Sequence, residues 1–311
     1  MRKIVLCVAL RERLQRKSFF ERNEQKRLQR KARRDPDFFS RLAARPNKKH
    51  KMNIIFYKFQ GTGNDFVMID NRQNDFPRDN SKIIERLCDR RFGVGGDGLI
   101  LLEKDAETDF KMVYFNADGN QSTMCGNGGR CLVAFANSLK IVKNSATFMA
   151  IDGLHHATID NFGVVALQMK DVDDVKIEND YVFLNTGSPH HVEIVENLPI
   201  YKVKENGARI RNSDLYGKEG SNVNFATKIS DNEFTIRTFE RGVEDETLSC
   251  GTGATATAIA MHATSNSDSN HININVEGGK LEISFDKIDN KYVNVFLKGA
   301  ATFVFSGTIN I

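Results

Sequence analysis

The sequence predicts an α+β protein of two pseudosymmetric domains, each a curled antiparallel, barrel-like sheet around one central helix. Three observations support this fold class. Many short strand-like segments alternate with turns along residues 52–311. Two apolar segments of helical length, 131–140 and 254–263, each follow a glycine-rich loop. The motifs around these two segments recur at nearly constant spacing along the chain.

The recurrence indicates an internal duplication. The pattern Cys-Gly-x-Gly stands at 125–128 and again, 125 residues later, at 250–253. The pair Thr-Gly stands at 62–63 and again, 124 residues later, at 186–187. Two motifs that recur in the same order, with nearly the same spacing, predict two halves of roughly 120–125 residues, which is a usual domain size.

The first half reads as strands around one helix-forming loop. Its strands are expected at 54–59, 66–70, 99–103, 110–115, 148–151, 157–159 and 164–169. A helix is expected at 81–92, with Ser81 as its N-cap. Residues 93–98 fit the pattern G-x-G-x-x-G, but a helix-like segment precedes them and a strand follows. The dinucleotide-binding motif needs the reverse order, so we set a nucleotide site aside.

The second half repeats this plan. Its strands are expected at 181–185, 192–195, 234–239, 272–276, 281–285 and 292–298. The helix at 254–263 is rich in Ala and Thr and has no polar face, so it should be buried on all sides. A closing strand at 301–305 is expected to return to the first half.

We therefore expect a first domain of residues 52–169 plus 297–311 and a second domain of residues 170–296. Residues 1–51 are expected to lie outside the fold as a basic extension. They hold 18 of the 44 Lys and Arg residues but 5 of the 40 Asp and Glu residues. Three interpretations stay open for them: an extension without catalytic use (or a start placed too early, before Met52), an arm for nucleic acid or a partner, and a targeting segment.

The rest of the chain is mildly acidic, with 26 basic and 35 acidic residues. This balance argues against nucleic-acid binding there, so that a nucleic acid is conceivable only through residues 1–51. No run approaches the 18 apolar residues of a membrane span, so no membrane association is expected. A homodimer stays an open expectation.

The five cysteines, at 7, 88, 125, 131 and 250, are odd in number and widely spaced. This pattern argues against a disulfide framework, and no Cys and His spacing predicts a metal site. Cys88 and Cys131 are interpreted as core residues. Two reactive thiols facing one ligand would oxidise to each other outside a reducing compartment, so we expect a cytoplasmic protein.

Cys125 and Cys250 each stand at the mouth of a predicted helix. The first turn of a helix has free backbone N–H groups and a positive dipole end, which bind anions and favour a thiolate. We therefore expect a thiol pKa lowered from about 8.5 toward about 3.5–7.5. Two thiols on opposite faces of one carbon can remove a proton from one side and return it on the other, which inverts a stereocentre.

Five motifs together resemble diaminopimelate epimerase, over residues 52–311. They are Gly63-Asn64-Asp65-Phe66, Phe115-Asn116-Ala117-Asp118-Gly119, Cys125-Gly126-Asn127-Gly128-Gly129-Arg130-Cys131, Glu240-Arg241-Gly242 and Cys250-Gly251-Thr252-Gly253-Ala254. The resemblance implies a two-domain pseudosymmetric fold. It also implies epimerisation of LL-2,6-diaminopimelate to the meso form without a cofactor, in lysine and peptidoglycan precursor biosynthesis.

The resemblance also implies roles for individual residues. Cys125 and Cys250 would be the base and acid pair. Backbone N–H groups would hold the reacting carboxylate at Gly126, Asn127, Gly251 and Thr252. Substrate contacts would come from Asn64, Asn116, Ser188, Asn222, Glu240 and Arg241. His190 and Glu240 would tune the pKa values of the thiols.

The chain departs from the family pattern at three points. Ser188 stands where many members have Asn before Pro-His, and Gly98 stands where some have Gln. The loop from Glu240 to Cys250 is one residue longer than in many members. These departures change substrate contacts rather than the thiol chemistry.

Three rival functions stay open at this stage. Proline or hydroxyproline racemases share the two-thiol plan, but their first loop typically reads Cys-Gly-His. A phenazine-type isomerase would lack the thiols. An RNA-binding protein built on a retired enzyme scaffold would not need Cys125 and Cys250, which are both present.

Overall fold

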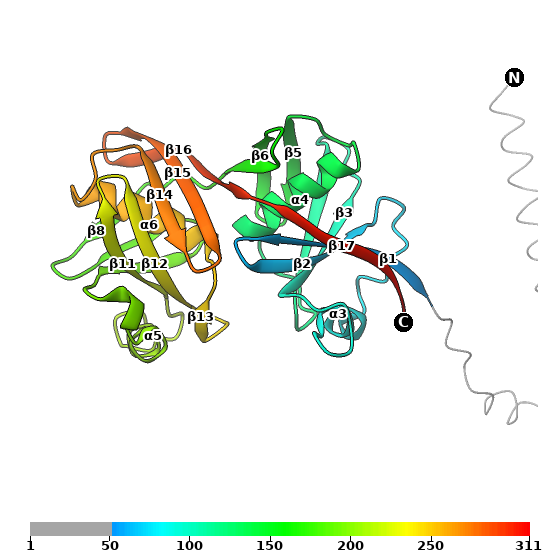
Figure 1. Cartoon of the computed structure of the whole chain (residues 1–311), viewed down its shortest axis with the longest axis horizontal. Helices are drawn as coiled ribbons and strands as arrows, with labels where there is room; N and C mark the ends of the chain where they lie inside the picture. Colours follow the sequence, from blue (N-terminus) through cyan, green and yellow to red (C-terminus); the bar gives the residue numbers. More distant parts are fainter. Residues whose placement is uncertain (1–51) are drawn as a thin grey trace, which may run out of the picture. The chain divides into compact units, whose positions relative to one another are not determined.

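The computed structural model describes residues 52–311, and the predictions made for residues 1–51 lie outside this part (Figure 1). The first half contains β1 (Asn53–Gly61), β2 (Asn64–Asp70), α3 (Ser81–Cys88), β3 (Gly98–Glu103), β4 (Phe110–Asn116), α4 (Gly126–Ser138), β5 (Ser145–Ala150), β6 (Gly153–Ile159) and β7 (Val164–Gln168). The second half contains β8 (Val175–Ile177), β9 (Val182–Asn185), β10 (Pro189–Ile194), η1 (Leu198–Ile200), α5 (Val203–Arg211), β11 (Asn222–Ser230), β12 (Glu233–Glu240), β13 (Asp245–Thr247), α6 (Gly251–Ala263), β14 (His271–Val276), β15 (Gly279–Ile288) and β16 (Lys291–Ala300). The last strand is β17 (Thr302–Asn310).

Strand pairing follows the same plan twice. In the first half the ladder runs β17, β1, β2, β3, β4, β5, β6, β7. In the second half it runs β8, β9, β10, β11, β12, β14, β15, β16. The parallel pairs, β2–β3 and β4–β5, have counterparts in β10–β11 and β12–β14, at the same places in the order. The predicted α+β duplication is confirmed, with parallel pairs added to a mainly antiparallel plan.

A single antiparallel pairing, β7 with β16, joins the two ladders edge to edge. β17 then pairs with β1 from Asn53 opposite Asn310 to Gln60 opposite Thr302. The predicted return of the last strand is therefore confirmed, and Figure 1 shows β17 alongside β1. The predicted domain boundary at residue 297 falls inside β16, which pairs with strands of both halves; the division into 52–169 plus 297–311 and 170–296 stays a prediction.

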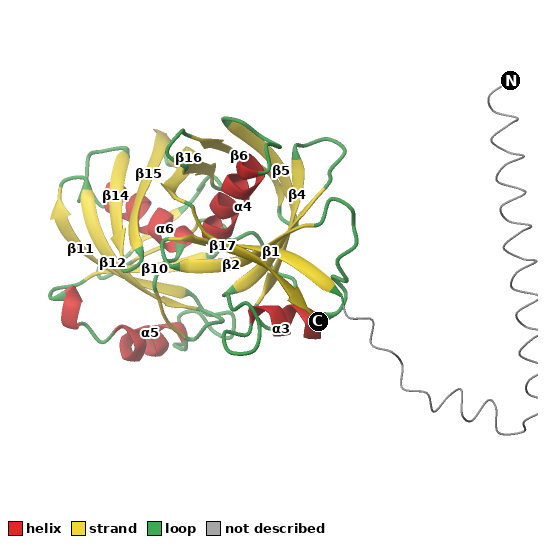
Figure 2. Ribbon diagram, turned by 45° about the vertical axis from the view of Figure 1, so that its right-hand side comes forward, coloured by secondary structure: helices red, strands yellow, loops and turns green. Residues whose placement is uncertain are grey.

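Each half is built around one helix (Figure 2). α4 contacts strands of the first ladder, including β1, β2, β3, β6 and β7. α6 contacts β8 to β12 and β14 to β16. The residues of α6 from Gly253 to Met261 are all buried, as the absence of a polar face predicted. Thr255 and Thr257 satisfy their hydroxyls inside the helix, on the carbonyls of Gly251 (3.0 Å) and Gly253 (2.9 Å).

α3 is shorter than predicted. It ends at Cys88, where Asp89 turns to an extended backbone (φ −64°, ψ 123°). The Asp89 carboxylate then accepts the N–H groups of Arg91 (2.7 Å) and Phe92 (2.6 Å), which a continuing helix would have used otherwise. The predicted N-cap is also wrong, because Asn80 is the cap and Ser81 is the first helical residue.

β11 and α5 were not predicted from the sequence. β11 carries the buried polar residues Asn222 and Asn224, which hide the apolar alternation of a strand. α5 has Gly207 in its interior, a poor helix former. A methyl group at Gly207 would lie 2.3 Å from Cβ of Phe239, so close packing of α5 on β12 requires the glycine.

Cys88 and Cys131 are core residues, as predicted. Both side chains are buried, and the four cysteines of residues 52–311 are free thiols. Burial raises the pKa of Cys88 and of Cys131 to about 12, so both stay neutral and inert near pH 7. No helix within residues 52–311 is long and apolar enough to span a membrane.

Replacing Phe148 by Ala should destabilise the first half strongly. Phe148 is fully buried, and its ring stacks on Phe110 with centroids 5.2 Å apart. We expect the free energy of unfolding to fall by about 3–5 kcal/mol, because removal of the ring leaves a cavity. Urea denaturation measures this loss. Phe162→Ala is the control: that side chain is 92% exposed, so its loss should stay within about 0.5 kcal/mol. Equal losses in the two variants would contradict the packing described here.

Candidate active site

The two predicted thiols occupy the same position at the start of the two central helices. Cys125 is the N-cap of α4 (φ −99°, ψ 127°) and Cys250 is the N-cap of α6 (φ −115°, ψ 109°). Their carbonyls accept the first helical hydrogen bonds, from Gly129 (2.7 Å) and Ala254 (2.9 Å). The prediction of a thiol at each helix mouth is confirmed. We call residues 124–130 the first thiol loop and residues 249–254 the second.

The two helix starts face each other. A methyl group at Gly126 would lie 3.8 Å from Cα of Gly251, and one at Gly251 would lie 3.3 Å from Oδ1 of Asn127. Both methyl groups would also press on Leu297, at 3.0 and 2.9 Å. The missing Cβ atoms allow this approach. The residues that follow Cys125 and Cys250 are therefore neighbours in space, although 125 positions separate them in the chain.

Asn64 connects the first thiol to an acidic group. Its Oδ1 accepts the thiol of Cys125 (3.5 Å) and Nδ2 of Asn127 (3.3 Å). Its own Nδ2 donates to Asp97 (2.6 Å), which Arg90 holds from the other side (2.7 Å). Asp97 thereby determines which end of the Asn64 amide faces the thiol. Asp97 and Arg90 were not predicted from the sequence as site residues. Asp97 lies in the glycine-rich segment 93–98.

The second thiol has polar neighbours of its own half. The Cys250 sulfur lies 3.4 Å from the hydroxyl of Thr252, whose carbonyl accepts the Thr186 hydroxyl at 2.9 Å. Glu240 accepts the hydroxyl of Thr247 at 2.5 Å, and its carboxyl lies near enough to Cys250 for the thiol to lower the pKa of Glu240. The predicted proximity of Glu240 to a thiol is therefore found at Cys250.

The thiol pKa values differ from the sequence prediction. Burial raises the pKa of Cys125 and raises the pKa of Cys250 well above its ordinary value. The negative charge of Glu240 adds to both rises. Hydrogen bonds from backbone N–H groups of the helix starts oppose them, those of Gly128 and Asn127 at Cys125. The predicted lowering is therefore wrong here, because loss of hydration outweighs the helix start.

His190 is fully buried on β10 and carries no charge near pH 7. Burial, helped by the positive charge of Arg241, lowers the pKa of His190 to about 3. Nδ2 of Asn224 lies 3.1 Å from Nδ1 of His190, while Oδ1 of Asn224 accepts the Thr238 hydroxyl (3.0 Å). An amide nitrogen donates, so Nδ1 accepts and the imidazole proton sits on Nε2. His190 thus adds no positive charge that would favour a thiolate.

Ser188, Asn222 and Arg241 form a second group. Nδ2 of Asn222 donates to the Ser188 hydroxyl (2.8 Å) and to the carbonyl of Pro189 (3.1 Å). Oδ1 of Asn222 accepts the backbone N–H of Arg241 (3.0 Å), and the Arg241 guanidinium donates to the carbonyl of Glu219 (3.0 Å). Three of the predicted contact residues are thus held in one hydrogen-bonded cluster.

Asn116 stands apart from these clusters. It ends β4 opposite Gly98, and it is exposed. Its backbone closes the turn to Asn120 (2.9 Å). In the β3–β4 pairing its partner Gly98 directly follows Asp97 in the chain.

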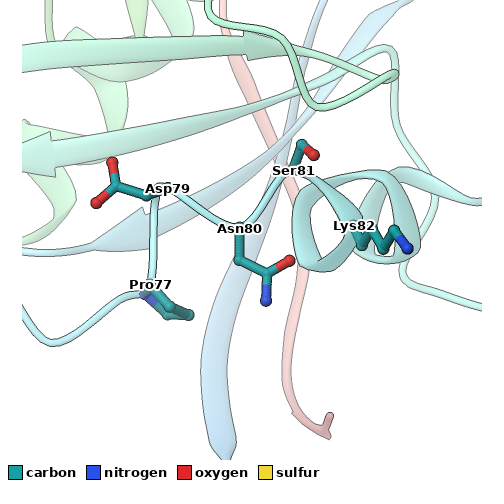
Figure 3. Close-up of a pocket in the computed structure, with 5 residues that line it drawn as sticks. All are labelled: Pro77, Asp79, Asn80, Ser81 and Lys82. Carbon is teal, nitrogen blue, oxygen red and sulfur yellow. The ribbon is translucent and has the colours of Figure 1, made fainter.

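A separate hollow lies at the start of α3 (Figure 3). It is lined by Pro77, Asp79, Asn80, Ser81 and Lys82. None of the predicted site residues lines it, and the thiol loops contribute nothing to it. We do not connect this hollow with the thiol chemistry.

Comparison with known proteins identifies close relatives. The family model for diaminopimelate epimerase matches residues 56–175 and 182–304. The diaminopimelate epimerase of Flavobacterium psychrophilum is 66% identical over 253 residues, which cover 81% of this chain and 99% of that protein. The diaminopimelate epimerase of Chlorobaculum tepidum is 39% identical over 260 residues, which again cover 81% and 99%.

Solved structures share the fold at low identity. A phenazine biosynthesis protein of the PhzF family from Bacillus anthracis matches with a TM-score of 0.68 and 13% identity, over 84% of this chain and all of that one. A hydroxyproline epimerase from Agrobacterium vitis, with bound trans-4-hydroxy-L-proline, matches with a TM-score of 0.61 and 13% identity, over 83% and 93%. At this identity the match supports the fold class alone.

Replacing Glu240 by Gln should lower the pKa values of both thiols, since its negative charge raises them. The alkylation rate of Cys125 and Cys250 by iodoacetamide, followed against pH with peptide mapping, should rise at lower pH in Glu240→Gln than in the unchanged protein. Glu196→Gln, at an exposed position, is the control and should not move either profile. Unaltered profiles in Glu240→Gln would show that the carboxylate does not act on the thiols.

Proposed function

Because this chain belongs to the diaminopimelate epimerase family, we propose that it interconverts LL-2,6-diaminopimelate and meso-diaminopimelate with two thiols and no cofactor. The single observation that supports this best is the pair of thiol N-caps on two facing helix starts. One α-carbon held there has one sulfur on each side. The reaction serves the supply of lysine and of peptidoglycan precursors.

The facing helix starts favour an anion between them. Each start carries a partial positive charge of about half an elementary charge, and the starts of α4 and α6 approach each other closely. The α-carboxylate of the substrate relieves this repulsion by accepting the free N–H groups of the first turns. These groups belong to Gly126, Asn127, Gly251 and Thr252. The same donors stabilise the negative charge that develops when the α-proton leaves.

The proton passes from one thiol site to the other. One sulfur, as thiolate, takes the α-proton, and the other, as thiol, returns a proton to the opposite face of the planar carbanion. The roles of Cys125 and Cys250 exchange when the reaction runs backwards. Both thiols have raised pKa values, so one must first lose a proton. Glu240 suits this transfer, because burial raises its own pKa and its carboxyl lies near Cys250.

The far end of the substrate carries a second ammonium and a second carboxylate. The cluster of Ser188, Asn222 and Arg241 suits these groups, because it offers a guanidinium and polar oxygens within one hydrogen-bonded unit. The Ser188 side chain is shorter than the Asn of many relatives, so it reaches the substrate over a longer distance or through a bridging water. Asn64, Asn116 and Glu240 are proposed as further polar contacts for the amino groups of the substrate.

The remaining expectations follow from this chemistry. Free thiols that work in pairs need a reducing compartment, which supports a cytoplasmic enzyme. The described residues offer a small-molecule site, and a nucleic acid is conceivable only through residues 1–51. β17 pairs along one edge with β1 and exposes Phe303, Val304 and Phe305, which suits a homodimer contact.

Cys125→Ala and Cys250→Ala should each lower the rate of epimerisation by about 10²–10⁴-fold, because each removes one partner of the proton transfer. The measurement is deuterium incorporation at the α-carbon of LL-diaminopimelate in heavy water, with no cofactor added, together with formation of the meso product. Cys88→Ala, which alters a buried core thiol, is the control and should retain activity. Near-normal turnover in either site variant would exclude the two-thiol mechanism, and turnover of proline or hydroxyproline alone would identify the rival racemase.

Arg241→Lys should weaken substrate binding by about tenfold or more, since an ammonium cannot reproduce the two-pronged contact of a guanidinium with a carboxylate. The measurement is KM for diaminopimelate. The matched control is Arg209→Lys on the exposed face of α5, which should leave KM unchanged. An unchanged KM in Arg241→Lys would mean that the distal carboxylate is bound elsewhere.

A further inference from the structure

Thr62 has a conformation that calls for an explanation. It lies in the turn between β1 and β2 with φ 50°, in the left-handed region that branched side chains avoid. Its side chain is nonetheless buried, with 6% of its surface exposed. Such strain persists only where surrounding contacts hold the backbone in place.

Those contacts come from the other half of the chain. The Thr62 hydroxyl lies 2.7 Å from the hydroxyl of Ser249, in the second thiol loop. A methyl group at Gly278, in the turn between β14 and β15, would lie 1.8 Å from the Thr62 carbonyl oxygen. Glycine at 278 therefore lets the strained turn sit against the second half.

Arg130 contributes a buried cation to the same point. It is fully buried in the first turns of α4, and it makes none of the ion pairs found among residues 52–311. Nη2 donates to the Thr62 hydroxyl (3.4 Å), while Nε and Nη1 have no partner. An unpaired buried guanidinium is costly, so its bond to Thr62 holds that hydroxyl with its acceptor side toward Arg130 and its proton toward Ser249.

Ser249 is also hydrogen-bonded to the first thiol loop. Nδ2 of Asn127 donates to the Ser249 carbonyl (3.1 Å) and lies 3.4 Å from its hydroxyl. Ser249 directly precedes Cys250, and Asn127 is two residues beyond Cys125. The chain Arg130, Thr62, Ser249, Asn127 therefore links the backbones that carry the two thiols.

The duplicated position does not make this link. Thr186, 124 residues after Thr62, donates to the carbonyl of Thr252 in its own half (2.9 Å). A methyl group at Gly187 would meet nothing within 4 Å, whereas one at Gly63 would lie 2.9 Å from Leu248. The turn at Thr62 therefore bonds to the other half of the chain, whereas the hydroxyl of Thr186, at the equivalent turn, bonds within its own half.

We propose that Thr62 is a positioning residue. Its hydroxyl, oriented by Arg130, holds Ser249 and thereby keeps the second thiol loop at a set distance from the first thiol loop. Its role in catalysis rests on the proposed function, but its role in setting the distance between the thiols does not. Loss of the hydroxyl leaves both thiols and all substrate contacts in the chain. The reacting atoms then lose their alignment, which slows the chemical step more than it weakens binding.

Thr62→Val tests this, because valine keeps the branched shape and removes the hydroxyl. We expect kcat to fall about tenfold, equivalent to about 1.4 kcal/mol, with little change in KM. Ser249→Ala should do the same. The double variant should be no slower than either single variant, since both single variants remove the bond between Thr62 and Ser249. Thr62→Ser, which keeps the hydroxyl, should retain kcat. Thr264→Val, at the far end of α6, is the control and removes a hydroxyl that bonds within its own helix.

A second readout does not depend on turnover. Diamide oxidises paired thiols, and the rate of Cys125–Cys250 disulfide formation, followed by mass spectrometry, reports how often the two loops bring the sulfurs together. We expect this rate to change at least threefold in Thr62→Val and Ser249→Ala and to stay unchanged in Thr264→Val and Thr62→Ser. If Thr62→Val does not fold, the same measurements on Ser249→Ala test the proposal.

The outcomes are distinct. Unchanged kcat and disulfide rate in folded Thr62→Val or Ser249→Ala would overturn the proposal, as would additive effects in the double variant. Absence of any Cys125–Cys250 disulfide in the unchanged protein would also overturn it. If the protein did not turn over diaminopimelate, the proposed function would fail while the disulfide rates still decided the role of Thr62.

Discussion

The close approach of two helix starts is the constraint on which the rest of the structure depends. α4 and α6 meet at Gly126 and Gly251, beneath Leu297, and side chains at these positions would collide. Two positive helix ends repel each other, so the arrangement costs free energy unless packing holds it. The packing comes from the two strand ladders, which bury both helices and join through β7 and β16. An anion between the helix starts removes the repulsion, which makes the same constraint a binding site.

Burial and the positive charge of the helix starts have opposite effects on the pKa values of the two thiols. A helix start alone would favour a thiolate, but the sheets that bring the two starts together also remove water from the sulfurs. The result is a raised pKa at Cys125 and at Cys250, to which the buried Glu240 adds. In the proposed reaction, one thiol must therefore lose its proton before it can act as the base. This limits oxidation between two thiols whose loops are neighbours, and it gives the proton transfer to Glu240 a place in the proposed reaction.

The duplication is reproduced in the strand order but not in the polar contacts. Parallel and antiparallel pairs recur at equivalent places in both ladders. The two turns marked by Thr-Gly differ, since Thr62 reaches across to Ser249 and Thr186 stays within its own half. Such a difference suits a substrate that reacts at one end and is held at the other. The second half holds Arg241 and Asn222, and the first holds Asn64 with Asp97.

The sequence by itself determined the duplication, the fold class, the thiol at each helix mouth and the return of the last strand. These follow from local patterns: apolar periodicity, glycine spacing and repeated motifs act over a few neighbouring residues. Contacts such as Asp97 to Asn64, Thr62 to Ser249 and the bonds of Asn224 were decided by tertiary structure alone, because they join residues far apart in the chain. The direction of the thiol pKa shifts belongs with them. Hydration of a sulfur depends on every element packed around it, and no local pattern records how much water the finished fold excludes.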